Sequence, residues 1–119
     1  MTALGWIAVA LAGGFAAGAR YLLDAEISRR TESVFPVGIL AVNVFGAFVL
    51  GLVAGSTLDG QSLVIVAGGV IGSFTTFSTW ILDSHLLVVT NKARLAWLNI
   101  ALSTALGFAA VALGHAIAV

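Results

Sequence analysis

The sequence predicts an all-α membrane protein of four transmembrane helices, forming a single domain over residues 1–119. Of these residues, 61% are hydrophobic and only 8% are charged, whereas soluble domains carry about 25% charged residues. A helix needs about 20 mostly apolar residues to cross the hydrocarbon of a bilayer. Four such helices use about two thirds of the chain, which leaves short loops and no room for a soluble catalytic domain.

We expect the first helix over residues 3–23, followed by a polar loop over residues 24–33. The chain begins without the positively charged segment of a cleavable signal peptide, so this helix is expected to be retained. The second helix is expected over residues 36–55. Pro36 favours this start because proline suits a first helical turn, where its missing N–H is not needed.

The third helix is expected over residues 63–89, with a break near its centre, and the fourth over residues 95–117. Three glycines and five hydroxyl residues follow one another between Gly68 and Thr79, a poor composition for a helix in mid-bilayer. Backbone groups freed at a break must be satisfied by protein or by an ion. The carbonyls of Gly72 and Thr75 are placed to bind a cation there. A kinked helix whose hydroxyls bond to their own turn is the alternative.

All five basic residues lie near the first or third loop, and the second loop and both ends of the chain have none. The positive-inside rule therefore places the first and third loops in the cytoplasm and both termini outside. The net charge is zero and no basic tail exists, which argues against nucleic acid as a partner. The basic residues are Arg20, Arg29, Arg30, Lys92 and Arg94.

Several polar and aromatic residues within the helices are candidates for an ion pathway. Asn43 lies seven residues beyond Pro36, about 10 Å of helix rise into the hydrocarbon. A polar residue at this depth marks either a pathway or a hydrogen bond between helices. Phe77 and Trp80 lie three residues apart and could present the positive edges of their rings to an anion, although two aromatic residues at this spacing more often serve packing. Thr76 and Ser103 add hydroxyl groups.

No pattern in the sequence indicates an enzyme. The chain has no cysteine, and no catalytic triad spacing, metal cluster or phosphate-binding loop is visible. Asp83 is expected near the membrane interface, where it could pair with a basic residue. A small multidrug or cation exporter of four helices would carry a glutamate in its first helix, and residues 3–23 contain no acid. An accessory protein without transport activity is a further alternative.

At this point the residues resemble a family, the Fluc (CrcB) fluoride channels. The third-helix signature is the most specific match, and the matches follow one another along nearly the whole chain. They are Gly13-Gly14, Gly18-Ala19-Arg20-Tyr21, Pro36-Val37-Gly38, Asn43-Val44-Phe45-Gly46-Ala47-Phe48, Gly72-Ser73-Phe74-Thr75-Thr76-Phe77-Ser78-Thr79, Ser103 and Gly107.

The resemblance implies an antiparallel dimer of four-helix subunits in the plasma membrane that passes fluoride out of the cell passively. It implies a structural sodium ion at the subunit interface, held by carbonyls at Gly72 and Thr75. It places Asn43 and Phe77 along the ion path, with Ser103 on a polar track. Arg20 and Gly46 lie within the matching signatures as structural or interface residues.

This sequence departs from the family pattern at three positions. Trp80 stands where a second phenylalanine is usual, Ile39 where threonine is common, and Asp83 where glutamate is common. A chain that inserts in both orientations needs balanced loop charges, yet all the basic residues here favour one side. We therefore expect either a dimer with itself or a subunit of fixed orientation that pairs with an oppositely oriented paralogue and is silent alone.

Overall fold

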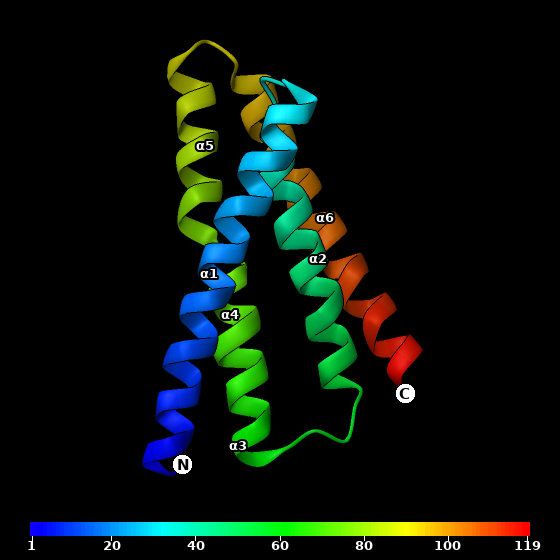
Figure 1. The fold of residues 1–119 in the computed structure, drawn as a ribbon. Helices are drawn as coiled ribbons and strands as arrows, with labels where there is room; N and C mark the ends of the chain where they lie inside the picture. Colours follow the sequence, from blue (N-terminus) through cyan, green and yellow to red (C-terminus); the bar gives the residue numbers. More distant parts are fainter.

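The computed structural model of the chain describes all 119 residues, and every regular element in it is a helix. Four helical segments are long and apolar enough to cross a membrane. The predicted all-α class and its four membrane helices are therefore confirmed (Figure 1). In chain order the elements are α1 (Ala3–Thr31), α2 (Val37–Ala54), α3 (Gly60–Leu63), the π-helix η1 (Val64–Ile71), α4 (Gly72–Phe74), α5 (Phe77–Val89) and α6 (Ala93–Ala118).

The first helix continues beyond its expected end, so that most of the predicted polar loop is helical. Within this extension Glu26 accepts bonds from Arg29 at 2.6 Å and from Arg30 at 2.7 Å. Such exposed pairs, three and four residues apart, support a helix weakly. The helix ends at Thr31 and is followed by Glu32, whose φ of 47° is left-handed. The polar residues therefore extend the helix beyond its apolar part.

The third membrane helix is interrupted near its centre, as predicted. Its first half contains η1, a π-helix, which is a rare form that is frequently found at functional sites. After α4 the backbone becomes extended at Thr75 (φ −82°, ψ 158°) and at Thr76 (φ −146°, ψ 123°). Helix α5 then starts at Phe77. The interruption thus divides the third membrane helix into two half-helices, of which the first ends at Phe74 and the second begins at Phe77.

Glycines allow two close contacts between helices. A Cβ on Gly51 of α2 would overlap the carbonyl oxygen of Val111, and one on Gly114 of α6 would overlap that of Phe48. Helices in lipid associate by such close backbone approach, since hydrophobic exclusion does not act between them. On the other side of the molecule, a Cβ on Gly69 of η1 would lie 3.3 Å from the Cα of Val9 in α1.

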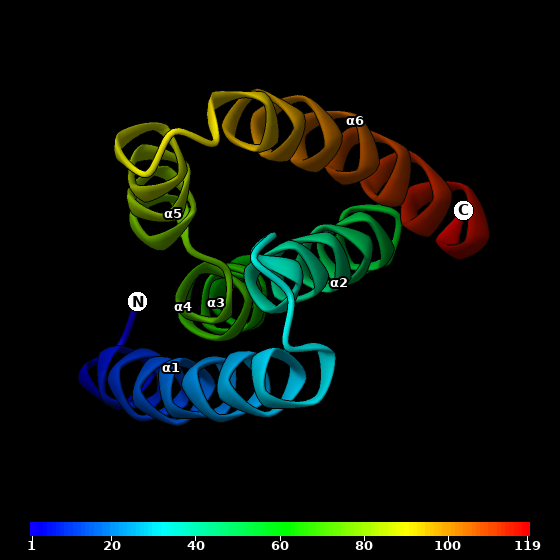
Figure 2. The ribbon, with the colours of Figure 1, turned by 90° about the horizontal axis from the view of Figure 1, so that it is seen from above.

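Figure 2 shows α2 and the stack of α3 and α4 at the centre, with α1 on one side and α5 and α6 on the other. The C-terminal end of α1 and the α5–α6 connection lie at one end of the molecule, and the N-terminus and the α2–α3 connection lie at the other (Figure 1). Only 14 residues are buried. Most large apolar side chains therefore point outward, as a protein surrounded by lipid requires.

Candidate functional site

The centre of the candidate site is the side chain of Asn43, which clamps the break in the third membrane helix. Its Nδ2 donates to the carbonyl oxygen of Thr76 at 2.9 Å, and its Oδ1 accepts from the N–H of Thr76 at 2.8 Å. Both backbone groups of Thr76 would otherwise be unpaired at membrane depth, where each costs several kcal/mol. The amide of α2 thus replaces the helical bonds that the break removes.

The break also withdraws two carbonyls from the helical hydrogen-bond ladder. The N–H of Thr76 would bond the carbonyl of Gly72 in a continuous helix, but it donates to Asn43 instead. The N–H of Thr79 likewise donates to the hydroxyl of Thr76 at 3.2 Å and not to the carbonyl of Thr75. The carbonyl oxygens of Gly72 and Thr75, the two predicted cation ligands, are therefore free of these bonds.

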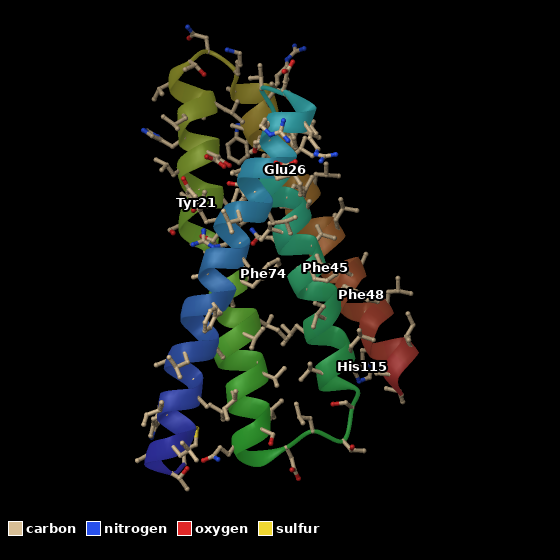
Figure 3. The ribbon with its side chains drawn as sticks, in the orientation of Figure 1. Tyr21, Glu26, Phe45, Phe48, Phe74 and His115 are labelled. Carbon is tan, nitrogen blue, oxygen red and sulfur yellow. The ribbon has the colours of Figure 1, made fainter.

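Gly46 makes room for the break on the α2 side. A Cβ at this position would overlap the Cγ2 methyl group of Thr75, so only glycine lets that threonine approach α2. Beside this contact the rings of Phe45 and Phe74 pack edge to face, with centroids 6.0 Å apart and planes at 69° (Figure 3). The predicted structural role of Gly46 therefore has a physical basis in this contact with Thr75.

The first turn of α5 carries the aromatic pair that the sequence singled out. The rings of Phe77 and Trp80 lie 5.5 Å apart, with an interplanar angle of 75°. Phe77 is 71% exposed and thus projects from the surface of the single chain. The indole Nε1 of Trp80 donates to the carbonyl oxygen of Asn99 in α6 at 3.4 Å. This N–H is therefore turned toward α6 and is not free to meet an ion.

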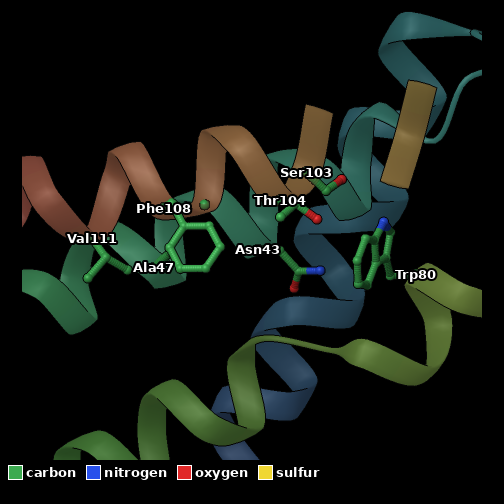
Figure 4. Close-up of a pocket in the computed structure, with 8 residues that line it drawn as sticks. Asn43, Ala47, Trp80, Ser103, Thr104, Phe108 and Val111 are labelled. Carbon is green, nitrogen blue, oxygen red and sulfur yellow. The ribbon is translucent and has the colours of Figure 1, made fainter. Parts of the chain in front are cut away.

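Two adjoining hollows collect most of the predicted pathway residues. One, of about 200 Å³, adjoins the break and is lined by Asn43, Thr75, Thr76, Phe77 and Trp80. The other, of about 310 Å³, is a groove between α2, α5 and α6, and Figure 4 shows the side chains of Asn43, Thr104 and Trp80 converging on it. The groove is lined by Asn43, Ala47, Trp80, Ser103, Thr104, Gly107, Phe108 and Val111.

Arg20, Ile39 and Asp83 line neither of these two hollows. The Nε of Arg20 is buried and has no hydrogen-bond partner within the chain. Ile39 is 2% exposed in α2, so the missing threonine hydroxyl would not have faced the groove. Asp83 lies with Asp24 in a separate hollow of about 330 Å³ near the basic end. The predicted pairing of Asp83 with a basic residue is wrong for the single chain, because both of its salt bridges are formed by Glu26.

The fold and this groove can be compared with known proteins. The family model described as CrcB-like protein, Camphor Resistance (CrcB), matches residues 7–115. The chain belongs to the CrcB family. With its four membrane-length helices, this CrcB-family chain is a multi-pass membrane protein.

Curated relatives carry a functional name. The chain is 41% identical over 113 residues to a protein of Mycobacterium tuberculosis named fluoride-specific ion channel FluC 2, covering 95% of this chain and 90% of that protein. It is 40% identical over 120 residues to fluoride-specific ion channel FluC 1 of Symbiobacterium thermophilum, covering 96% of this chain and 97% of that protein. A second protein of that organism, FluC 2, is 41% identical over 115 residues.

Sequence reasoning missed several residues of this CrcB-family site. Thr104 and Phe108 line the groove one turn apart on α6, and the spacing of Ser103, Thr104 and Gly107 was the only available signal. Nothing in the sequence indicated that Asn99 is only 1% exposed between α5 and α6. Its burial depends on the angle between two helices that are joined by a short loop.

Proposed function

We propose that this chain is a subunit of a fluoride-selective channel that lets fluoride leave the cell passively and so relieves fluoride toxicity. The observation that carries the proposal is the groove at the helix break, where an amide, hydroxyl groups and aromatic rings meet. The names of the relatives support fluoride as the ion.

The chemistry of the groove suits a small anion. Fluoride holds its water tightly, so a pathway must offer donors in exchange for that water. Asn43 spends one N–H on Thr76 and retains a second. The edges of the Phe77 and Trp80 rings carry partial positive charge. Thr76 and Ser103 contribute hydroxyl groups beside them.

The break adds a favourable field. Helix α5 starts at Phe77, beside Asn43, and the N-terminus of a helix carries unpaired N–H groups and about half a positive charge. No lysine, arginine, aspartate or glutamate lines the groove. An anion would thus be attracted without being held by a fixed positive charge. The absence of an acid there favours passive conduction over proton-coupled export.

A partner chain is part of the proposal, because polar groups of the groove would otherwise face lipid. Asn43 and Ser103 are partly exposed on the surface of the single chain, and Thr104 is exposed, all within membrane helices. Such groups need protein or water around them. We expect an antiparallel second subunit, either a copy of this chain or a paralogue. The two homologous channels in one Symbiobacterium support the second possibility.

A structural sodium ion fits the carbonyls at the break. The carbonyl oxygens of Gly72 and Thr75 lack their α-helical partners, and neutral oxygens at an unwound segment suit sodium. Gly72 is exposed, and a Cβ there would meet only the carbonyl of Ala67 in the chain, so a second subunit can approach this face. When bound, sodium would join the two subunits and add positive potential near the anion path.

Sodium dependence can be measured without transport. The purified chain is equilibrated in sodium or in N-methylglucamine, and its thermal unfolding and dimer fraction are compared. We expect a lower unfolding temperature and less dimer without sodium, with potassium unable to substitute. Equal behaviour in both salts would contradict the sodium site.

The proposed function is tested by fluoride efflux from liposomes that contain the purified chain, with chloride efflux as the control. Fast fluoride efflux that excludes chloride would establish a channel that needs no other subunit. If the chain alone passes nothing, a co-reconstituted paralogue separates the two remaining interpretations. Activity of the pair identifies a subunit silent alone, and inactivity of the pair refutes the channel.

A further inference from the structure

The buried side chain of Asn99 connects two groups that line the groove. It lies on α6 at 1% exposure and does not itself line the groove. Its Nδ2 donates to the hydroxyl of Ser84 in α5 at 2.9 Å. Its Oδ1 accepts from the hydroxyl of Ser103, one turn further along α6, at 3.3 Å. One amide thus bonds both helices at the level of the groove.

These bonds close into a ring that includes Trp80. The hydroxyl of Ser84, which accepts from Asn99, donates to the backbone carbonyl of Trp80 at 3.0 Å. The indole Nε1 of Trp80 in turn donates to the backbone carbonyl of Asn99 at 3.4 Å. Hydrogen bonds in such a ring support one another. The ring fixes where α5 meets α6 and how the indole is turned.

We infer that Asn99 is a positioning residue for the ion pathway, which sets the spacing between the Trp80 ring edge and the Ser103 hydroxyl and thereby the selectivity for a small anion. This inference depends on the proposed channel function. Trp80 and Ser103 both line the groove, and each is bonded to Asn99. Trp80 also packs against Phe77, so the ring holds the whole aromatic pair.

Asn99 also controls how readily Ser103 can serve an anion. A carboxamide oxygen only accepts, so the hydroxyl proton of Ser103 is directed at Asn99 in the resting state. Their separation of 3.3 Å marks a weak bond. Ser103 can therefore turn this proton toward a passing anion at low cost. A larger anion would need the indole to move as well, and the ring opposes that movement.

The ring can be tested through the indole resonances of the ¹⁵N-labelled chain, which has three tryptophans. Trp80→Phe identifies the Trp80 signal. Ser84→Val removes the hydroxyl group. Ser84→Thr introduces a side chain of the same shape as valine but keeps the hydroxyl group. We expect the Trp80 indole proton to shift in the valine variant and to retain the wild-type position in the threonine variant, while the Trp6 and Trp97 signals stay in place.

The same pair is then compared in efflux measurements, together with Asn99→Leu. We expect Ser84→Val and Asn99→Leu to reduce the ratio of fluoride to chloride efflux by roughly 5- to 100-fold, the effect of one unsatisfied buried group. Ser84→Thr should retain the wild-type ratio. In a background of Trp80→Phe and Ser103→Ala, Asn99→Leu should have little additional effect, because residues that act as a unit are not additive.

An indole signal that is the same in the valine and threonine variants would overturn the ring, even if Asn99→Leu does not fold. A full additional loss in the doubly substituted background would show that Asn99 does not act through Trp80 and Ser103, and would overturn the positioning role. If the wild-type chain, alone and with its paralogue, passes no fluoride, the channel proposal fails. The indole comparison still decides whether Asn99 holds the tryptophan.

Discussion

At the residue scale, Asn43 both stabilises the helix break and offers a hydrogen-bond donor to the groove, and different atoms of its side chain serve these two roles. A carboxamide offers two N–H donors and two acceptor positions. One donor and one acceptor are used on Thr76, which leaves a second N–H for the groove. Part of any loss of activity on replacing Asn43 will therefore come from disorder at the break, in addition to the loss of a group that meets the ion.

Replacing Asn43 tests this division. We expect Asn43→Leu to abolish fluoride efflux and to destabilise the chain by roughly 2–6 kcal/mol, since two partly buried backbone groups of Thr76 lose their partners at about 1–3 kcal/mol each. Asn43→Asp keeps the acceptor for the Thr76 N–H and should destabilise the chain less. Thermal unfolding in detergent gives the order of stabilities. A leucine variant as stable as wild type would contradict the clamp.

The contact between Gly46 and Thr75 allows a test by compensation. Gly46→Ala should reduce both stability and efflux, because its Cβ would displace the Cγ2 methyl group of Thr75. Thr75→Ser removes that methyl group and keeps the hydroxyl, which donates to the carbonyl of Ile71 at 3.1 Å. We expect Thr75→Ser to restore most of the stability that Gly46→Ala loses.

The control for this test is Gly14→Ala, since no atom of the chain lies within 4 Å of the Cβ that it would add. It should leave the thermal stability of the single chain unchanged. Failure of Thr75→Ser to compensate, with Gly46→Ala clearly destabilised, would mean that the alanine perturbs α2 itself.

At the scale of helices, the crossing of α2 and α6 is the tightest contact and the one that sets the groove. At Gly51 and Gly114 the backbone of the other helix lies so close that an added Cβ would overlap it. The groove is lined by residues of the same two helices. The positions of Asn43 on α2 and of Ser103 on α6 thus depend on glycines several residues away.

Substitution at this crossing should therefore act at a distance. We expect Gly51→Ala to cost roughly 1–3 kcal/mol of stability, as overpacking does, because the obstructing atom is the backbone carbonyl of Val111, which cannot rotate away. Fluoride efflux should fall although Gly51 does not line the groove. Unchanged unfolding temperature and efflux would show that the helices separate without effect on the pathway.

The helices also show how far sequence patterns reach. The position of the break followed from the run of glycines and hydroxyl residues, because these residues have low helix propensity. The π-helix η1 and the helical extension of α1 did not follow. In the structure Gly69 of η1 packs against Val9 of α1, and Glu26 pairs with two arginines within the extension.

At the scale of the whole molecule, the basic residues gather at one end. The C-terminal end of α1 and the α5–α6 connection, which carry Arg29, Arg30, Lys92 and Arg94, lie together, and the opposite end has no lysine or arginine (Figure 1). From the positive-inside rule we expect one orientation in the membrane, with the basic end in the cytoplasm and the termini outside. A chain of one orientation can form an antiparallel pair only with a different chain.

A reporter fused to the C-terminus tests the orientation. We expect it to be almost entirely external, and expect substitution of Arg29, Arg30, Lys92 and Arg94 by glutamine to give a mixed population, since the charge difference that sets the orientation is then lost. The same reporter on the N-terminus should report the same side. Equal cytoplasmic and external populations of the wild-type chain would instead support a dimer of identical chains.

Composition and patterning were sufficient for the class of this protein, its four membrane helices and the place of the break. Each of these depends on local chemistry: the length of an apolar segment compared with the thickness of the bilayer, and residues of low helix propensity. The partners of the polar groups were a matter of three-dimensional packing. Asn43 bonds Thr76 and Asn99 bonds Ser84 because glycine contacts bring particular helices to particular depths. Pairings between residues distant in the chain depend on these crossings, which no local pattern encodes.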